Sequence, residues 1–257
     1  MIEGLFNTDT EALARRIQAH AQFGARDLDG WVMGHLELRD GLRVLDLGCG
    51  TGKQVIPVAQ AVGATGSVIG VDLSPEAVET VRRRAAETGV ADRVRTVQAG
   101  LDEADGLLGD ARFDRVVSCY ALYYTREPRR LFEALARRME PGGSVFFCGP
   151  APDNNRELKE FHYRLKGDQN APGIAAAEFM AGVGQQLARE FFATVEVDTF
   201  ENPLRFDSAE ALHTYWSSYN LYDPSLDDAF RAAAADHFTR NEVFETVKRV
   251  LGVKARS

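Results

Sequence analysis

A glycine-rich segment flanked by acidic residues carries the clearest chemistry in this 257-residue sequence. Gly48, Gly50 and Gly52 follow a short apolar run and precede a stretch with helical pattern. At such a junction, glycine's missing Cβ and the bare N–H groups of the backbone let a ligand approach closely. Asp72 follows Gly52 by 20 residues, at the end of the next apolar run, where its carboxylate can accept hydrogen bonds from both hydroxyls of a ribose. The pattern predicts a site for an adenosine-type ligand.

Three classes of ligand use loops of this kind, and the flanking residues distinguish them. A nucleoside triphosphate loop needs four residues between its first glycine and the Gly-Lys pair, but only three separate Gly48 from Gly52-Lys53. A dinucleotide loop needs a glycine at the position of Lys53. Asp46 lies two residues before Gly48, where a buried carboxylate would repel a pyrophosphate and attract a cation. S-adenosylmethionine (SAM) carries an ammonium and a sulfonium, so the segment favours SAM.

The segment 44–52 resembles the first motif of class I SAM-dependent methyltransferases. Three later segments resemble further motifs of that family and follow in the expected order: the ribose-binding second strand at 68–75, the fourth strand at 113–122 and the turn before the fifth strand at 135–143. The resemblance covers about 40–150 and is strongest to ubiquinone/menaquinone-type and small-molecule methyltransferases.

The resemblance implies roles for residues around the glycine loop. It places Asp46 and the backbone of Gly48 at the methionyl amino end, Asp72 on the ribose and Leu73 beside the adenine. Further positions expected at the cofactor are Phe23, Cys49, Gly50, Gly100, Leu101 and Cys119. The third strand departs from the family, because many members carry an acidic residue toward the adenine amino group where this chain has Ala99-Gly-Leu-Asp102. Either Asp102 or the backbone around Gly100 and Leu101 takes that role.

The acceptor wall is expected after the fourth strand, because ligands bind at the carboxyl ends of strands in such sheets. Tyr120, Tyr123 and Tyr124 follow that strand and suit an apolar or cationic acceptor, although packing beneath the cofactor explains them equally well. Trp216 lies in an aromatic-rich helical stretch that we interpret either as a lid over the acceptor or as ordinary helix packing.

Methyl transfer from a sulfonium is an in-line displacement that needs no nucleophile from the enzyme, and alignment alone supplies roughly 7–11 kcal/mol. A base adds about 10²–10⁴ in rate if the acceptor is a hydroxyl or an acidic carbon. His162 and Tyr124 are the candidate bases, with a structural helix position as the competing interpretation of His162. His20 is a weaker candidate to face the site. No spacing of His, Cys and carboxylates matches a metal site, so we predict no metal.

Two polar segments are interpreted as structural. Asn154 and Asn155 follow the fifth strand, where a turn or a helix cap is a better explanation than contact with a polar acceptor. The basic run 82–84 is expected to be a solvated face of a helix.

Short β-rich runs alternate with helical stretches from Arg43 onward, which predicts parallel crossover units. We expect an α/β fold with a doubly wound, Rossmann-like, seven-stranded and mostly parallel sheet and helical lid insertions. The expected strands are 43–47, 67–73, 93–98, 113–119, 144–148, 194–201 and 244–255. The expected helices are 53–61, 75–88, 101–108, 129–139, 156–166, 175–191, 208–219 and 226–239.

The composition is that of a globular protein with a full hydrophobic core, because 45% of the residues are hydrophobic and 26% are charged. We expect one domain over 1–257, with an N-terminal helical cap at about 8–38, a core at about 40–150 and acceptor-side lid elements at about 150–190 and 205–240. No apolar run approaches the roughly 20 residues that cross a bilayer, and the first residues lack a secretory signal. A cytoplasmic protein is expected.

A net charge of −8 argues against a nucleic-acid partner, because such binding depends on clustered Lys and Arg. The three widely spaced cysteines match no disulfide framework, so we expect reduced thiols. We therefore expect a SAM-dependent methyltransferase that acts on a small organic acceptor and releases S-adenosyl-L-homocysteine. The alternatives are a non-catalytic SAM-binding sensor, an NAD(P)-dependent oxidoreductase disfavoured by Lys53 and Asp46, and an RNA methyltransferase disfavoured by the acidic balance. The sequence indicates no oligomeric state.

Overall fold

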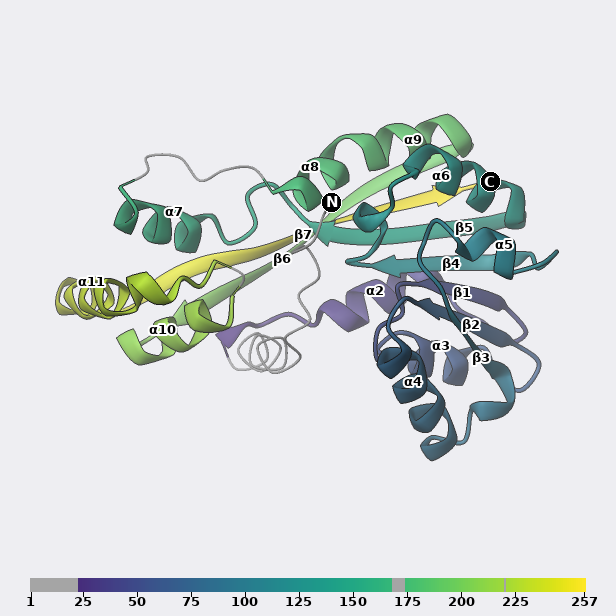
Figure 1. Ribbon diagram of the computed structural model, residues 1–257, viewed down its shortest axis with the longest axis horizontal. Coiled ribbons are helices and arrows are strands. Elements are labelled where there is room, and N and C mark those ends of the chain that lie inside the picture. Colours follow the sequence, from purple (N-terminus) through teal and green to yellow (C-terminus); the bar gives the residue numbers. More distant parts are fainter. Residues whose placement is uncertain (1–22, 168–173, 220) are drawn as a thin grey trace. The chain divides into compact units, whose positions relative to one another are not determined.

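The computed structural model describes residues 23–167, 174–219 and 221–257. They form a seven-stranded sheet with the order β3-β2-β1-β4-β5-β7-β6 (Figure 1). The strands are β1 (Arg43–Leu47), β2 (Ser67–Asp72), β3 (Val94–Gln98), β4 (Phe113–Cys119), β5 (Met139–Pro150), β6 (Thr194–Phe206) and β7 (Phe244–Arg256). The first five pair in parallel, whereas β7 pairs antiparallel with β5. The prediction of a seven-stranded, mostly parallel sheet is confirmed.

The strand order reverses between β1 and β4. From β1 the chain builds outward through β2 to β3, and it then returns to β4 on the other side of β1. In open parallel sheets this reversal leaves a crevice outside the carboxyl ends of the two central strands, and ligands bind there. Gly48 follows β1 directly and Tyr120 follows β4, so the topology places both at this point.

The chain divides into two compact units. The sheet unit comprises Leu28–Pro152, Ile174–Phe200 and Val250–Ser257, and the helical unit comprises Met1–Asp27, Asp153–Gly173 and Glu201–Arg249. Strands β6 and β7 contribute residues to both units. The single-domain organisation expected from the sequence stays a prediction. Of the expected N-terminal cap at about 8–38, residues 23–38 are described, whereas His20 lies outside the described residues.

Helices cover both faces of the sheet unit because its strands are apolar on both sides. Side chains alternate along a strand, so Leu45 and Leu47 join one core and Val44 joins the other. The first core is completed by α5 (Ala104–Leu107), α6 (Pro128–Arg138), α8 (Ala175–Ala181) and α9 (Val183–Phe191), and the second by α2 (Leu28–Leu36), α3 (Val55–Ala61) and α4 (Pro75–Glu87). Asp46, two residues after Val44 in β1, points to the same face of the sheet as Val44, among otherwise apolar side chains.

Helix α4 shows why the expected boundaries hold where local signals are strong. Ser74 is its N-cap and accepts a hydrogen bond from the backbone of Ala77 at 3.1 Å, and Pro75 occupies the first helical position. Several boundaries differ. The end of the turn expected at 135–143 lies inside β5, where the pairing with β4 shifts register, and β6 continues to Phe206, beyond the expected 201. Gly182 divides the expected helix 175–191, and α5 is shorter than 101–108.

The helical unit has its own core. Helices α7 (Arg156–Leu165), α10 (Ala209–Ser218) and α11 (Asp227–Arg240) agree with the predicted helices to within a few residues. The rings of Trp216 and Phe230 stack with centroids 4.0 Å apart, and both side chains are fully buried. Among the described residues, none of the helices is long and apolar enough to span a membrane.

Candidate functional site

The glycine loop lies tightly against the end of β4. Gly48 has φ +74°, which L side chains rarely adopt, and a Cβ built there would lie 2.2 Å from the Cβ of Ala121. A side chain at position 48 would force the two segments apart. By contrast, a Cβ on Gly50 (φ +50°) meets nothing within 4 Å, so this glycine borders open space. The loop therefore combines close packing at its first glycine with an open face at its second.

The loop's N–H groups point mostly at the protein. Gly48 and Cys49 both donate to the carbonyl of Val71, at 2.8 and 3.0 Å, and Gly52 donates to the carbonyl of Cys49 at 3.0 Å. Gly50 donates to Oδ2 of Asp72 at 2.7 Å. The sequence-based expectation of bare N–H groups is wrong for these four residues. A pyrophosphate would have to displace these bonds, which disfavours a dinucleotide at this loop.

Asp46 is a buried carboxylate that lacks a full set of partners. Its side chain is 1% exposed, and Oδ2 has no hydrogen-bond partner. Burial, reinforced by the nearby charge of Asp72, raises the pKa of Asp46 to about 8. Such a group is stabilised when a cation comes beside it. The ammonium of SAM therefore fits the site at this atom.

Asp72 ends β2 beside the loop. Its Oδ2 accepts from Gly50, and its Oδ1 accepts from the backbone N–H of Ser74 at 2.9 Å. Each carboxylate oxygen can accept a second hydrogen bond, so the two vicinal hydroxyls of a ribose can still be bound. The next residue, Leu73, is 55% exposed and offers an apolar surface on which an adenine can lie.

Asp102 is already engaged by the segment that leads into α6. Its carboxylate accepts from the hydroxyl of Thr125 and from the backbone N–H groups of Arg126 and Glu127. These bonds lower its pKa although burial opposes the shift. Asp102 therefore has a structural role in this segment, and the choice between Asp102 and the backbone around Gly100 and Leu101 for the adenine amino group stays a prediction.

The cysteines at the site are neutral thiols. Cys49 is buried, and burial raises its pKa. Cys119 ends β4 opposite Cys148 of β5, and the hydrogen bond with Cys148, followed by burial, raises its pKa. Cys49, Cys119 and Cys148 are all free thiols. Thiolate chemistry at these positions is therefore disfavoured.

The three tyrosines after β4 differ in setting. Tyr120 has φ +58°, a strained conformation for a large side chain of the kind that gathers at functional sites, and its N–H donates to the carbonyl of Cys148 at 2.8 Å. Tyr123 packs beside Gly149, and burial raises the pKa of its hydroxyl, which disfavours ionisation of this tyrosine. Tyr124 lies next to it, with the ring centroids 4.7 Å apart.

The remaining predicted site residues belong to the helical unit. Phe23 packs on Phe206, with ring centroids 4.9 Å apart. His162 is 2% exposed, and its Nδ1 accepts from Nε1 of Trp216 at 3.3 Å, which leaves the proton of the neutral ring on Nε2. Burial also lowers the pKa of His162. In this state His162 is a hydrogen-bond donor at Nε2, whereas a base would need a free lone pair there.

Two contacts to the loop were missed by sequence reasoning. Arg84 of α4 donates to the carbonyl of Thr51 at 2.7 Å, and Lys53 pairs with Asp29 at 3.0 Å. Arg84 belongs to the basic run interpreted as a solvated face, and local sequence carries no signal that singles it out. Among residues 23–167, 174–219 and 221–257, no group of three His, Cys, Asp or Glu side chains is arranged for a metal; the absence of a metal stays a prediction.

A doubly wound sheet with a glycine loop at its switch point, a buried acid before the loop and a second acid at the end of β2 defines a SAM-type site. A family model described as a methyltransferase domain matches residues 44–143. Ubiquinone biosynthesis O-methyltransferase of Paracidovorax citrulli is 30% identical over 194 residues, 74% of this chain and 72% of that protein. Nocamycin O-methyltransferase of Saccharothrix syringae is 32% identical over 233 residues, 79% and 78% of the two chains. The chain belongs to the class I SAM-dependent methyltransferases.

The fold has solved relatives. A SAM-dependent methyltransferase from Thiobacillus denitrificans, solved with S-adenosyl-L-homocysteine, has a TM-score of 0.51 and 20% identity, with 89% of this chain and 90% of that chain covered. At this identity the likeness establishes the fold, and the family establishes the use of SAM.

Proposed function

We propose that this enzyme transfers the methyl group of SAM to an oxygen of a small organic acceptor by in-line displacement. The assignment of SAM as the methyl donor rests on two acids, Asp46 in β1 and Asp72 at the end of β2, of which Asp46 is buried and has one carboxylate oxygen without a partner within the described structure. The acceptor side is supported by the two O-methyltransferase relatives and by the net charge of −8, which disfavours nucleic acid. A cytoplasmic location is part of the proposal.

The sheet unit's residues have assigned roles in this proposal. Asp46 and the carbonyl side of the Gly48 loop hold the ammonium, Asp72 holds the ribose and Leu73 covers the adenine. When bound, SAM supplies a methyl carbon activated by its sulfonium. The protein's own contribution is to hold this group and the acceptor in line and to exclude water, so no nucleophilic side chain is required.

Tyr120, Tyr123 and Tyr124 at the end of β4 remain the proposed acceptor wall, with Tyr120 the strongest member because its backbone is strained. Tyr124 stays the proposed base, should the acceptor need one. His162 is instead proposed as a hydrogen-bond donor, because its Nδ1 is engaged by Trp216. Phe23 and Trp216 stay proposals for the cofactor cover and the acceptor side.

Two measurements test the proposal. Calorimetry should show SAM binding without comparable binding of NADH, and the reverse preference would contradict it. Release of S-adenosyl-L-homocysteine should then be detected with at least one member of a panel of phenols, amines, thiols and carboxylic acids. SAM binding without turnover on any acceptor would instead favour the sensor alternative, and turnover only on amines or thiols would overturn the choice of oxygen.

A further inference from the structure

The start of α7 contains a buried amide oxygen without a hydrogen-bond partner and a largely buried lysine without an ion pair among the described residues. Asn155 is 1% exposed; its Nδ2 donates to the hydroxyl of Tyr215 at 3.1 Å, but its Oδ1 accepts no hydrogen bond. Exchanging the two amide atoms would only transfer the missing partner to the other atom. Lys159 is 6% exposed and, within the described part of the chain, forms no ion pair. Burying such groups costs free energy unless a partner is supplied.

Asn155 is also conformationally unusual. It occupies the N-cap position of α7 with φ +52°, in the left-handed region, and its side chain makes no capping hydrogen bond. The expectation of a turn or a helix cap is confirmed for the position, because the turn 152–155 leads into α7 and Asn155 is the N-cap, but the side chain itself does not cap the helix. A strained residue whose amide turns away from its own helix is one of the recognised signs of a functional position.

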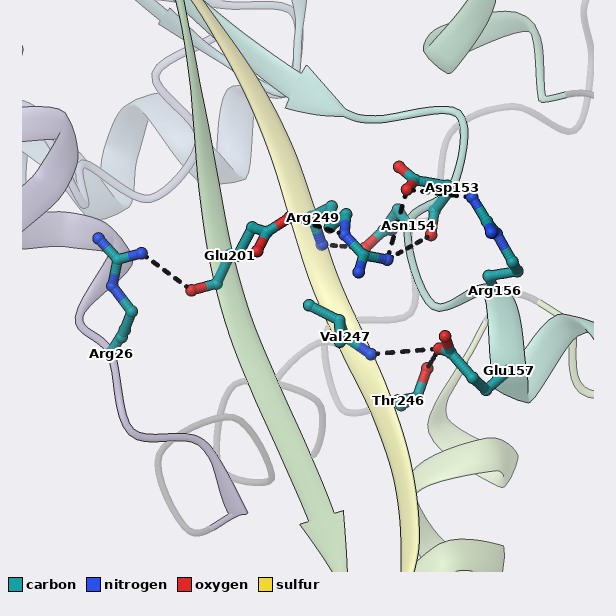
Figure 2. Close-up of polar contacts among 9 residues, drawn as sticks. All are labelled: Arg26, Asp153, Asn154, Arg156, Glu157, Glu201, Thr246, Val247 and Arg249. Atoms are coloured by element: carbon teal, nitrogen blue, oxygen red, sulfur yellow. Dashed lines mark hydrogen bonds and ion pairs between the residues drawn. The ribbon is translucent and has the colours of Figure 1, made fainter.

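Arg249 holds the segment before Asn155 in place (Figure 2). Its guanidinium lies 3.4 Å from the carboxylate of Asp153 and 2.9 Å from that of Glu201, and its backbone N–H donates to Oδ1 of Asn154 at 2.9 Å. Asp153 and Asn154 are thus both tied to β7. The only described charge that acts on Lys159 from this network is Asp153, whose carboxylate is shared with Arg249 and Arg156.

The segment is held equally firmly on the other side of Asn155. Glu157 accepts from the hydroxyl of Thr246 at 2.9 Å and from the backbone N–H of Val247 at 3.4 Å (Figure 2). The N–H of Asn155 donates to the carbonyl of Val247 at 2.9 Å. The backbone is therefore fixed around Asn155 while, across the part of the chain that the structure describes, its Oδ1 has no hydrogen-bond partner and Lys159 has no ion pair. A preorganised backbone with unpaired side chains is the arrangement expected of a binding site.

Helix periodicity places these groups together. Asn155, Lys159 and His162 are spaced i, i+4 and i+7, which puts them on one face of α7, and all three are buried. His162 presents Nε2–H as a donor. The face therefore offers an acceptor at Asn155, a charged donor at Lys159 and a neutral donor at His162, beside the aromatic residues Tyr215 and Trp216 that contact this face.

We propose that this face of α7, formed by Asn155, Lys159 and His162, is a ligand site of the helical unit and that its ligand is a small aromatic hydroxy acid. Lys159 pairs with the acid group, and Asn155 Oδ1 accepts from a hydroxyl, so the two missing partners are supplied by one molecule. Aromatic neighbours suit an aromatic body. The proposal concerns the helical unit alone, so it can be tested independently of the proposed function.

The direct test is calorimetric titration of the full chain, saturated with S-adenosyl-L-homocysteine, with the three isomers of hydroxybenzoate. Benzoate lacks the hydroxyl and the hydroxybenzamides lack the charge, so they are the matched controls. At least one hydroxybenzoate should bind about tenfold or more tightly than both of its controls. Equal affinity for acid and amide, or no binding of any hydroxybenzoate, would overturn the proposal.

Variants assign the preference to residues. Lys159→Met should abolish the preference for acid over amide, whereas Lys166→Met, which removes a charge at the C-cap of α7 that pairs with Asp223, should retain it. Asn155→Gly keeps the left-handed backbone and should abolish the preference for hydroxybenzoate over benzoate. Equal effects of Lys159→Met and Lys166→Met would refute the site. Melting temperature and SAM affinity, measured for every variant, separate misfolding and failure of the donor site from failure of this face.

Discussion

The backbone N–H of Gly50 donates to Oδ2 of Asp72 at 2.7 Å, so the loop after β1 is bonded to the residue that ends β2. The carboxylate proposed to hold the ribose is therefore also a structural part of the glycine loop. Loss of Asp72 would remove ligand contacts and release the N–H of Gly50 in the same step. The two acids of the site are coupled as well, because the charge of Asp72 contributes to the raised pKa of Asp46.

Asp72→Ala should weaken SAM binding by about tenfold to a hundredfold, because hydrogen bonds to a charged group contribute roughly 1.5–3 kcal/mol. Calorimetry measures the effect. Asp92→Ala is the matched control, since Asp92 is an exposed acid in the same unit and, within the described part of the chain, its side chain bonds to Arg93. Unchanged affinity in Asp72→Ala, with the control also unchanged, would refute the ribose assignment.

Asp46 predicts a pH dependence of SAM binding. With a pKa of about 8, the carboxyl of the ligand-free protein is mostly protonated at pH 6–7, and a cation bound beside it favours the ionised form. Binding therefore releases a proton, and affinity should rise by up to about tenfold per pH unit between pH 6 and 7. Asp46→Asn should bind SAM more weakly and lose this part of the slope. An identical slope in both proteins would contradict the assignment.

We expect the substitution Asp46→Asn to stabilise the ligand-free protein at alkaline pH. An acid whose pKa is raised on folding contributes less stability as the pH rises from its unfolded value near 4 to its folded value near 8. Ligand-free Asp46→Asn should therefore melt at a higher temperature than the natural protein at pH 8, and the difference should shrink toward pH 4. Thermal unfolding followed by circular dichroism at several pH values measures this, and a lower melting temperature at pH 8 would count against the prediction.

Sequence patterns predicted the parts of the site that depend on local chain geometry. Residues 43–72 contain an apolar run, a glycine loop, a helix and a second apolar run, and these elements place Asp46, Gly48 and Asp72 through chain connectivity alone. The contact between Arg84 and Thr51 joins residues 33 positions apart, so it depends on how α4 packs. Likewise Asp102 bonds to the segment 125–127, more than 20 residues away. Long-range pairing of side chains cannot be read from periodicity.

Two irregular segments were predicted only in part. The segment Pro141-Gly-Gly has the composition of a turn, and it forms an irregularity within β5, where the pairing with β4 passes from Phe113–Met139 to Arg115–Ser144. Asn155 occupies the N-cap position that composition indicated, but its amide contacts Tyr215 and does not cap the helix. The partner of this amide lies 60 residues away, so local sequence could not indicate it.

Gly48→Ala should destabilise the protein by at least about 2 kcal/mol, because it adds a collision with the Cβ of Ala121 to the cost of a left-handed backbone. Gly50→Ala is the control that isolates the collision: its backbone is also left-handed, but a Cβ there meets open space. The double variant Gly48→Ala/Ala121→Gly should recover part of the loss. Urea unfolding measures all three, and equal destabilisation by the two single glycine variants would show that the contact with Ala121 is unimportant.

Arg84 is expected to position the glycine loop for SAM. Its guanidinium holds the carbonyl of Thr51 at 2.7 Å, so Arg84→Met should loosen the loop and weaken SAM binding by about 2- to 10-fold. Arg83→Met is the matched control, because the neighbouring Arg83 is exposed and pairs only with Glu87 on its own helix among the contacts described. The two variants should have similar melting temperatures, since each loses one partly exposed contact. A positioning role requires that SAM affinity fall in Arg84→Met alone and recover partly in Arg84→Lys, whose ammonium can still donate to a carbonyl. Equal SAM affinities in the Arg83 and Arg84 variants would show that the contact is incidental.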